Sequence, residues 1–282
     1  MLAIIWGTTW GAIRLGLSGL PPFTAVSARF ALASVVLLSV AKATRVPLGR
    51  QPLEKTLWLV NGVLFFSVSF GVVYWTEQYL PSGLTALLFS LFPLLVAVLA
   101  HFALPGESLN RRSVAGIVLG FVGLAVIFSE DFSTLGGEGA RLAAAVLLLS
   151  PTVSAVSSVA IKKYGSGIHP ISLAAVPMAI CSVVMAALAL ATERGRPVSW
   201  SPAAVGATIY LAVCGSAVTF TLYYWLLRHA PASRVSLLAY LSPVIAVATG
   251  VVFLHEPLTV RIVLGGGLVI AGVALAGTAR RY

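Results

Sequence analysis

Long apolar runs, separated by short polar or Pro/Gly turns, dominate the 282-residue chain. A helix that crosses a bilayer needs about 20 mostly apolar residues. Ten segments meet this length, and they are predicted at residues 2–18, 22–42, 56–77, 82–104, 112–129, 140–161, 170–192, 203–226, 232–254 and 260–279. The sequence lacks the alternating segments of about 10 residues that build a membrane β-barrel. The pattern therefore predicts an all-α integral membrane protein with ten transmembrane helices.

Composition agrees with this class, since 59% of the residues are hydrophobic and only 9% are charged. A soluble domain usually carries about 25% charged residues, and a disordered chain is poor in apolar ones. Cys181 and Cys214 both fall in predicted spans, where packing is expected rather than a disulfide. The sequence shows no metal-ligand cluster, phosphate loop or catalytic triad. We therefore predict no cofactor, no metal and no enzymatic activity.

The net charge of +10 reports membrane topology. Of the 18 Lys and Arg residues, 12 fall in connections on the same side as the two termini: Lys42, Arg45, Arg50, Lys55, Arg111, Arg112, Lys162, Lys163, Arg228, Arg234, Arg280 and Arg281. Four lie on the opposite side with most of the acids, and Arg14 and Arg29 lie within apolar stretches. The positive-inside rule then places the N- and C-termini in the cytoplasm. A nucleic-acid partner is not expected.

The two halves of the chain resemble each other at shifts of 148 to 150 residues. The matching pairs are Arg14/Lys162, Pro22/Pro170, Tyr74/Tyr224, Pro81/Pro231, Pro93/Pro243, Glu107/Glu256, Arg112/Arg261, Gly116/Gly265 and Gly123/Gly272. The chain is therefore predicted to consist of two five-helix repeats, residues 1–130 and 139–282. Because each repeat has an odd number of spans, the second enters the membrane from the opposite side. Such inverted repeats are typical of secondary transporters, which bind substrate between the halves and work by alternating access.

Glycines are predicted to serve helix packing. Gly7/Gly11 and Gly116/Gly120 have GxxxG spacing, and Gly265 opens a run of three glycines. Small residues let helices approach closely. We expect the fifth and tenth spans to pack against their own repeat or against each other.

The opening Trp6-Gly7-Thr8-Thr9-Trp10-Gly11, followed by Arg14, Pro22 and Arg29, resembles that of an EamA-type member of the drug/metabolite transporter (DMT) superfamily. The fourth and ninth spans fit the same pattern, since each begins at a proline, holds a central proline and is followed by a glutamate. Within the superfamily the chain is most similar to the YddG-type exporters of aromatic amino acids. This resemblance implies ten helices in two inverted halves. One departure is Pro177, which stands where a second arginine would match Arg29.

We therefore expect a multi-pass exporter of aromatic or other apolar amino acids in a bacterial inner membrane. Its partners are a small-molecule substrate and the lipid bilayer, and a monomer is compatible with the sequence. The alternatives are efflux of drugs or of another metabolite, such as a nucleotide-derived compound, and, in a different class, a non-transporting membrane sensor or enzyme. No acidic residue is predicted mid-membrane, which disfavours a carboxylate proton relay. His101 is the alternative proton carrier, and facilitated diffusion fits best.

The candidate substrate site consists of polar and aromatic residues on helices around the repeat axis. They are Trp6, Trp10, Arg29, Tyr74, Gln78, Tyr79, Ser90, Tyr224, Tyr240 and Ser242. Aromatic rings can stack on a flat substrate, while hydroxyl and amide groups fix its charged ends. Arg29 either binds a substrate carboxylate, clamps backbone carbonyls or extends to the interface. Tyr240 and Ser242 precede Pro243, which frees a backbone carbonyl inside the span, as cavities tolerate.

Overall fold

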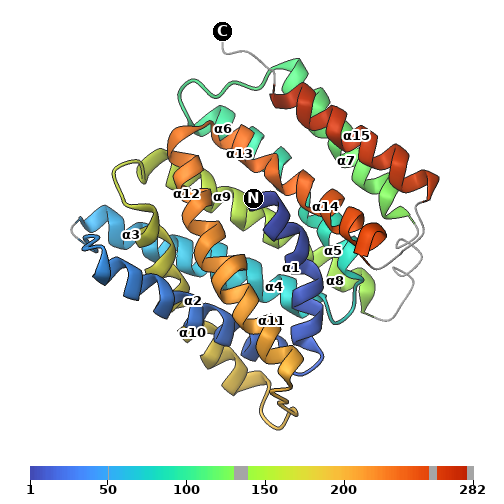
Figure 1. Cartoon of the computed structure of the whole chain (residues 1–282). Helices are drawn as coiled ribbons and strands as arrows, with labels where there is room; N and C mark the ends of the chain where they lie inside the picture. Colours follow the sequence, from blue (N-terminus) through green and yellow to red (C-terminus); the bar gives the residue numbers. More distant parts are fainter. Residues whose placement is uncertain (50, 130–138, 254–258, 278–282) are drawn as a thin grey trace.

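Helices alone build the described part of the chain, and they pack into one bundle (Figure 1). The computed structural model describes residues 1–49, 51–129, 139–253 and 259–277, with the backbone alone for 246–253. Among these residues, seven helices are long and apolar enough to cross a membrane, and Leu2–Leu17 and Ala232–Ile245 are shorter apolar helices. The predicted all-α membrane class is confirmed, while the count of ten spans and the side of the termini stay predictions.

The helices follow the predicted segments, several of them in two or three pieces. The first half contains α1 (Leu2–Leu17), α2 (Pro22–Ala43), α3 (Pro52–Val60), η1 (Asn61–Ser69), α4 (Phe70–Thr76), α5 (Ser82–Phe89), α6 (Phe92–Ala103) and α7 (Arg111–Ile127). The second half contains α8 (Ala140–Leu147), α9 (Leu149–Tyr164), α10 (Pro170–Thr192), α11 (Pro202–Ala212), η3 (Val213–Val218), α12 (Thr219–His229), α13 (Ala232–Ser236), α14 (Leu238–Phe253) and α15 (Val260–Gly277).

Proline and side-chain caps determine where several helices begin. Proline is the first residue of α2, α3, α10 and α11, where its missing N–H costs no hydrogen bond. The third span consequently starts at Pro52, earlier than the predicted residue 56. Asn110 caps α7 by accepting the backbone N–H of Ser113 at 2.8 Å. These helices therefore begin in the short connections that the sequence predicts.

The fourth predicted span is interrupted between α5 and α6, directly before Pro93. The N–H of Ser90 is shared between the carbonyls of Ala86 and Leu87, four and three residues earlier, at 3.0 Å each, and the Ser90 hydroxyl also donates to Leu87. Pro93 has no N–H with which to continue the backbone hydrogen bonds of the helix, and a tighter turn precedes it.

The second half has a matching interruption between α13 and α14 at Leu237. Tyr240, which corresponds to Ser90 at a shift of 150, donates its N–H to the carbonyl of Leu237 at 3.0 Å. Pro243 itself stays inside α14. The two proline-containing spans therefore share a tightened turn three residues before the proline.

Two further spans contain a π-helical segment at corresponding positions. The run α3–η1–α4 includes η1 (Asn61–Ser69), and the run α11–η3–α12 includes η3 (Val213–Val218). Shifted by 150 residues, η1 overlaps all of η3. Because π-turns are rare and are found mostly at functional sites, this pairing directs attention to what the two segments face.

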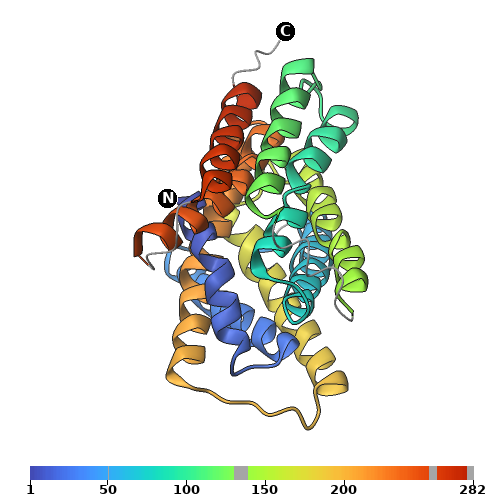
Figure 2. The same ribbon diagram turned by 90° about the vertical axis from the view of Figure 1, so that its right-hand side faces the viewer.

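The long helices α7 and α15 lie side by side at one edge of the bundle (Figures 1 and 2). A Cβ added to Gly116 would lie 2.5 Å from the carbonyl oxygen of Gly272, and one added to Gly123 would lie 2.6 Å from that of Gly265. The backbones therefore touch, and of the two predicted packings the fifth and tenth spans adopt the one against each other.

Acidic side chains tie the two halves together at helix N-termini. Glu107 accepts the backbone N–H groups of Ala232 and Ser233, at 2.7 and 3.0 Å, at the start of α13. Glu193 accepts the N–H of Thr24, at 2.9 Å, at the start of α2. A carboxylate there satisfies N–H groups that have no partner within the helix and meets the positive end of its dipole.

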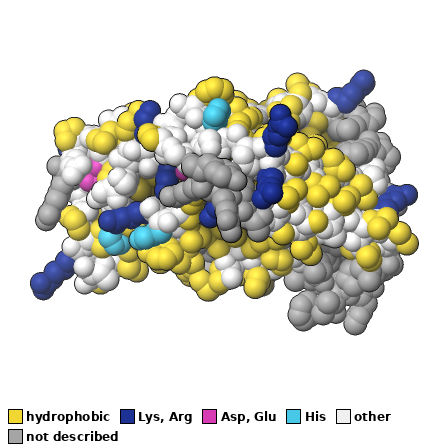
Figure 3. All heavy atoms as spheres, turned by 90° about the horizontal axis from the view of Figure 1, so that it is seen from above, with side chains coloured by type: hydrophobic (Ala, Val, Ile, Leu, Met, Phe, Trp, Pro, Cys, Tyr) yellow, Lys and Arg dark blue, Asp and Glu magenta, His cyan; other side chains and the backbone are white. Residues whose placement is uncertain are grey.

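Basic side chains outnumber acidic ones on the face seen from above (Figure 3), where hydrophobic side chains cover much of the surface between them. Several charged residues of the topology prediction lie outside the described residues: Arg50, Glu130, Asp131, Glu138, Glu256, Arg280 and Arg281. Figure 3 therefore shows only part of the charge pattern.

Candidate functional site

A cavity of about 90 Å³ lies within the bundle, among α1, α2, η1, α4, α5, α6, α12 and α14. It is lined by Trp6, Thr9, Trp10, Ile13, Arg29, Phe65, Ser69, Phe70, Val73, Ala86, Phe89, Phe92, Phe220, Tyr223, Ala239, Ser242 and Pro243. Eight of these 17 residues are aromatic, and among the described lining residues Arg29 alone is charged. The cavity is therefore an apolar chamber with one cationic group.

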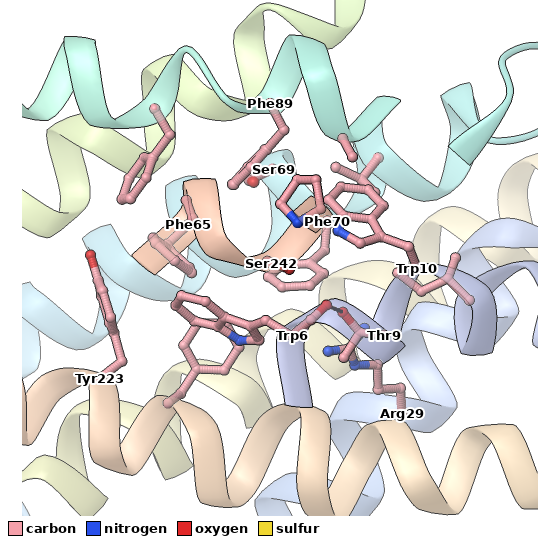
Figure 4. A pocket seen from close by; sticks show the side chains of 17 residues that line it. Trp6, Thr9, Trp10, Arg29, Phe65, Ser69, Phe70, Phe89, Tyr223 and Ser242 are labelled. Atoms are coloured by element: carbon pink, nitrogen blue, oxygen red, sulfur yellow. Dashed lines mark hydrogen bonds between the residues drawn. The ribbon is translucent and has the colours of Figure 1, made fainter. Parts of the chain in front are cut away.

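Aromatic rings from both halves face one another across this chamber (Figure 4). Trp6 and Trp10 project from α1, and their rings lie 5.6 Å from Tyr223 and 6.2 Å from Phe89, centroid to centroid. Phe65 of η1 lies 5.4 Å from Phe220 of α12, edge to face. These separations fall in the range of favourable ring contacts, so the walls are rigid and apolar.

Arg29 of α2 is 2% exposed and is held by neutral groups. Its Nε donates to the Ser216 hydroxyl at 2.8 Å, one Nη donates to the Tyr74 hydroxyl at 3.2 Å, and the other donates to the Gly215 carbonyl at 3.0 Å. A guanidinium has five N–H groups, so two remain beyond these bonds. No carboxylate among the described residues pairs with Arg29.

The guanidinium carbon of Arg29 also lies over two phenylalanine rings. It is 4.9 Å from the ring centroid of Phe70 and 5.1 Å from that of Phe30. The negative faces of the rings stabilise the cation. Because Phe70 lines the cavity, these contacts place the positive charge in the cavity wall.

The two π-helical segments supply groups to this wall. Phe65 and Ser69 of η1 line the cavity, while Gly215 and Ser216 of η3 hold Arg29. A Cβ added to Gly215 would lie 3.0 Å from the Thr9 Cγ2 and 3.5 Å from an Arg29 Nη. The absence of a side chain at Gly215 therefore lets α1 and the arginine approach the widened helix.

The hydroxyl groups of the cavity differ in how far they are engaged. Thr9 donates to the carbonyl of Trp6 at 2.7 Å, and Ser69 shares a 2.7 Å bond with Ser150. The Ser242 hydroxyl is buried and has no hydrogen-bond partner. Because a buried polar group without a partner is costly, Ser242 is the wall position best placed to bond a ligand.

The structure brings several residues of the predicted site together. Trp6, Trp10, Arg29 and Ser242 line one cavity, although they come from the first, second and ninth predicted spans. Tyr74 is 1% exposed and adjoins the cavity through its bond to Arg29. Arg29 also meets the alternative reading as a clamp, since one of its three bonds goes to a backbone carbonyl.

Three other predicted residues are buried away from the cavity. Tyr224 bonds to the side chain of Asn61, and Tyr240 donates its hydroxyl to the carbonyl of Ile117 at 3.0 Å. Ser90 donates within its own helix. None of the three belongs to the lining residues described, because each side chain points into a neighbouring helix or back along its own.

Gln78 and Tyr79 lie at the exposed end of α4. The Gln78 amide accepts a bond from Arg196 at 3.3 Å, and Tyr79 is 44% exposed with its ring 5.0 Å from Trp75. Both positions are typical of side chains at a membrane interface. Neither lies among the lining residues described.

The sequence prediction missed the phenylalanines of the cavity and Thr9. Phe65, Phe70 and Phe220 form much of the wall, but in an apolar chain a phenylalanine is expected equally in the core, at the lipid or in a cavity. One signal was present: Phe70 precedes Tyr74 by four residues in the same span, which is the spacing of a helical face.

A helical membrane bundle with an internal aromatic cavity and one buried cation defines a protein that handles small molecules within the bilayer. A sequence profile of the EamA-like transporter family matches residues 1–129 and 141–278. The chain belongs to this family and is a multi-pass membrane transporter, which implies a small-molecule substrate and contact with lipid.

Similar proteins agree with this assignment. The chain is 28% identical to the uncharacterized transporter YvbV of Bacillus subtilis, over 98% of this chain and 89% of that protein. It is also 28% identical to the uncharacterized inner membrane transporter YedA of Escherichia coli, over 97% and 87% of the two chains. A solved crystal structure matches with a TM-score of 0.81 at 19% identity, covering 98% of this chain and 94% of the other, which shows the shared fold.

Proposed function

We propose that the protein exports small apolar metabolites, foremost aromatic or other apolar amino acids, from this cavity by alternating access. The observation that carries the proposal is a single buried arginine, Arg29, with two uncommitted N–H groups in an aromatic chamber. A guanidinium binds a carboxylate through charge-assisted hydrogen bonds, and ring faces receive an apolar side chain. The same chamber would have to open in turn to each side of the membrane.

Contacts between the halves support two inverted repeats, residues 1–130 and 139–282. Gly116 and Gly123 correspond to Gly265 and Gly272 at a shift of 149. The observed contacts, Gly116 with Gly272 and Gly123 with Gly265, exchange with each other under this shift. Such reciprocal contacts are what a two-fold relation between equivalent surfaces produces, and their order makes the two helices antiparallel.

Two acid contacts show a weaker form of this relation, in which the helix starts are equivalent positions and the two acids are not. The Thr24 hydroxyl donates to Glu193 at 2.7 Å, and the Ser172 hydroxyl donates to Glu54. Thr24 and Ser172 are equivalent positions of α2 and α10 at a shift of 148. Each half therefore supplies a buried carboxylate to the same helix start of the other, which supports ten spans arranged as inverted halves.

The proposed location is a bacterial inner membrane with both termini in the cytoplasm. The charge bias of the connections supports this orientation. The Escherichia coli relative YedA is named an inner membrane transporter, which supports the assignment to this membrane.

We propose facilitated diffusion as the mode of transport. No carboxylate belongs to the described cavity wall. His101 is exposed, and its Nδ1 accepts the backbone N–H of Leu109 at 3.2 Å, which favours a structural role over proton transfer. A proton relay usually needs a titratable group that faces the substrate pathway.

The test is uptake and counterflow of radiolabelled phenylalanine and tryptophan in proteoliposomes. Saturable transport that survives a protonophore is expected, and Trp6→Ala should reduce it strongly while Trp200→Ala, at a 52% exposed position outside the cavity, should not. If no aromatic amino acid moves or competes, the proposed substrate class is wrong. If a protonophore abolishes this transport, facilitated diffusion is wrong.

A further inference from the structure

The cavity wall described here carries one positive charge and no negative one. Arg29 provides the charge, and its three hydrogen-bond partners are a hydroxyl, a phenol and a carbonyl. The chamber therefore sets a cation without a protein counter-charge against a small apolar space. Its best ligand is one that brings a single negative charge and little other polarity.

We propose that the cavity selects aromatic monocarboxylates that lack an ammonium group over the corresponding amino acids. This inference rests on the proposed function, because it narrows the substrate class of the same chamber. The carboxylate would bond the two uncommitted N–H groups of Arg29, and the ring would lie among Trp6, Trp10 and Phe70.

The ammonium group of an amino acid finds no counter-charge in this wall. Besides Arg29, the polar side-chain groups of the lining are the hydroxyls of Thr9, Ser69, Tyr223 and Ser242 and the indole N–H groups of Trp6 and Trp10, and none of them is negatively charged. The first three already make hydrogen bonds of 2.7 to 2.9 Å to other groups. A buried ammonium that meets only neutral hydroxyls loses more hydration than it regains, whereas a carboxylate beside Arg29 is both paired and hydrogen-bonded.

Two wall positions make this selection more specific. The buried Ser242 hydroxyl has no partner and can donate to a carboxylate oxygen. Thr9 lies beside Arg29, since a Cβ on Gly215 would contact both side chains (Figure 4). A negative charge introduced at Thr9 would therefore pair with Arg29 and cancel the proposed preference.

Three compounds with the same ring and chain isolate the effect of charge: 3-phenylpropanoate, phenylalanine and 2-phenylethylamine. Each competes against counterflow of radiolabelled 3-phenylpropanoate into proteoliposomes at pH 7.5, with protein-free liposomes subtracted for passive leak. We expect the half-inhibiting concentration of 3-phenylpropanoate to be at least tenfold below that of phenylalanine, and 2-phenylethylamine to compete least.

The outcomes separate the two proposals. If phenylalanine is carried and competes as well as 3-phenylpropanoate or better, the inference is overturned while the proposed function stands. If none of the compounds is carried or competes, both are overturned. The wild-type comparison needs no variant, so a misfolded mutant does not affect it.

Two variants test the named wall positions. Ser242→Ala should raise the half-saturating concentration of 3-phenylpropanoate three- to tenfold, while Thr56→Ala, on the exposed face of α3, should leave it unchanged. Thr9→Asp should invert the order, so that phenylalanine competes better than 3-phenylpropanoate. An unchanged order in a folded Thr9→Asp protein would contradict the proposed role of the Arg29 charge.

Discussion

Arg29 combines the burial of a core residue with the charge of a binding residue. Its three protein hydrogen bonds and two ring contacts hold the guanidinium in one orientation. An arginine buried in a membrane protein costs several kcal/mol by the scales in use, and neutral partners offset this only in part. The arrangement supports the proposal that a ligand completes the shell of Arg29 during the transport cycle.

Replacing Arg29 with lysine tests whether the shape of the guanidinium matters as well as its charge. An ammonium has three N–H groups, so it cannot bond Ser216, Tyr74 and Gly215 at once and still offer two N–H groups to a ligand. We expect Arg29→Lys to reduce transport of carboxylate substrates at least tenfold. Tyr74→Phe, which removes one partner at 3.2 Å, should cost about 1 kcal/mol of stability and keep most of the transport. Equal loss of transport in both variants would contradict a direct role for the guanidinium.

The sequence predicted residues of this site where polarity made them unusual in an apolar span. Trp6, Trp10, Arg29 and Ser242 were found for that reason. Ser90 and Tyr240 have the same polarity but bond to carbonyls of helices, and only packing distinguishes these two outcomes. The phenylalanine walls carry no polar signal at all, so their place depends on how distant helices meet.

At the scale of elements, four departures from regular α-helix lie in spans that line the cavity or hold Arg29. The π-helical segments η1 and η3 supply Phe65 and the partners of Arg29, and the interruptions before Phe92 and Leu238 lie in the spans that supply Phe89 and Ala239. The central prolines of the fourth and ninth spans, Pro93 and Pro243, indicated where these two helices are interrupted. The π-turns contain no proline and were not predicted, and the contact of η3 with Arg29 joins segments that are far apart in the sequence.

Gly215→Ala tests whether the widened turn of η3 positions Arg29. The new Cβ would lie 3.0 Å from Thr9 Cγ2 and 3.5 Å from an Arg29 Nη, so the arginine or α1 must shift. We expect weaker substrate binding, measured as a several-fold higher half-saturating concentration. Gly206→Ala is the matched control, because it lies on the preceding helix α11 with no atom within 4 Å of its Cβ position. If both variants behave alike, η3 does not position the arginine.

The acid at the start of α2 offers a second element-scale prediction. Glu193 accepts the N–H groups of Phe23 and Thr24 at 2.8 and 2.9 Å, and it belongs to the other half of the chain. Glu193→Gln keeps the shape but removes the charge and one acceptor, so thermal unfolding in detergent should show a loss of about 1 kcal/mol. Arg194→Gln, a change of charge at the next residue, should leave stability nearly unchanged. Equal stability of the Glu193→Gln protein and the wild type would contradict this cap.

At the scale of the whole molecule, the contact between α7 and α15 lies apart from the cavity that we propose for transport. No described residue of α7 or α15 lines the cavity, and these two helices join the halves through glycine contacts between backbones. The sequence predicted glycine packing of these spans and the two-half organisation from spacing alone. The sequence left open whether each span packs within its own half, because a GxxxG pattern does not identify the helix that packs against it.

This separation predicts that damage to the α7–α15 contact changes stability without changing substrate affinity. A Cβ at Gly123 would lie 2.6 Å from the carbonyl of Gly265, and backbone on both sides leaves no flexible group to move aside. Gly123→Ala must therefore push the helices apart, and overpacking of this kind costs about 1–3 kcal/mol. We expect a lower melting temperature in detergent, with the half-saturating substrate concentration of the remaining folded protein unchanged. Gly267→Ala, in α15 with no atom within 4 Å, should keep the wild-type melting temperature. A changed half-saturating concentration in Gly123→Ala would mean that the scaffold contact is coupled to the chamber, as it would be if the two halves slide along this interface during alternating access.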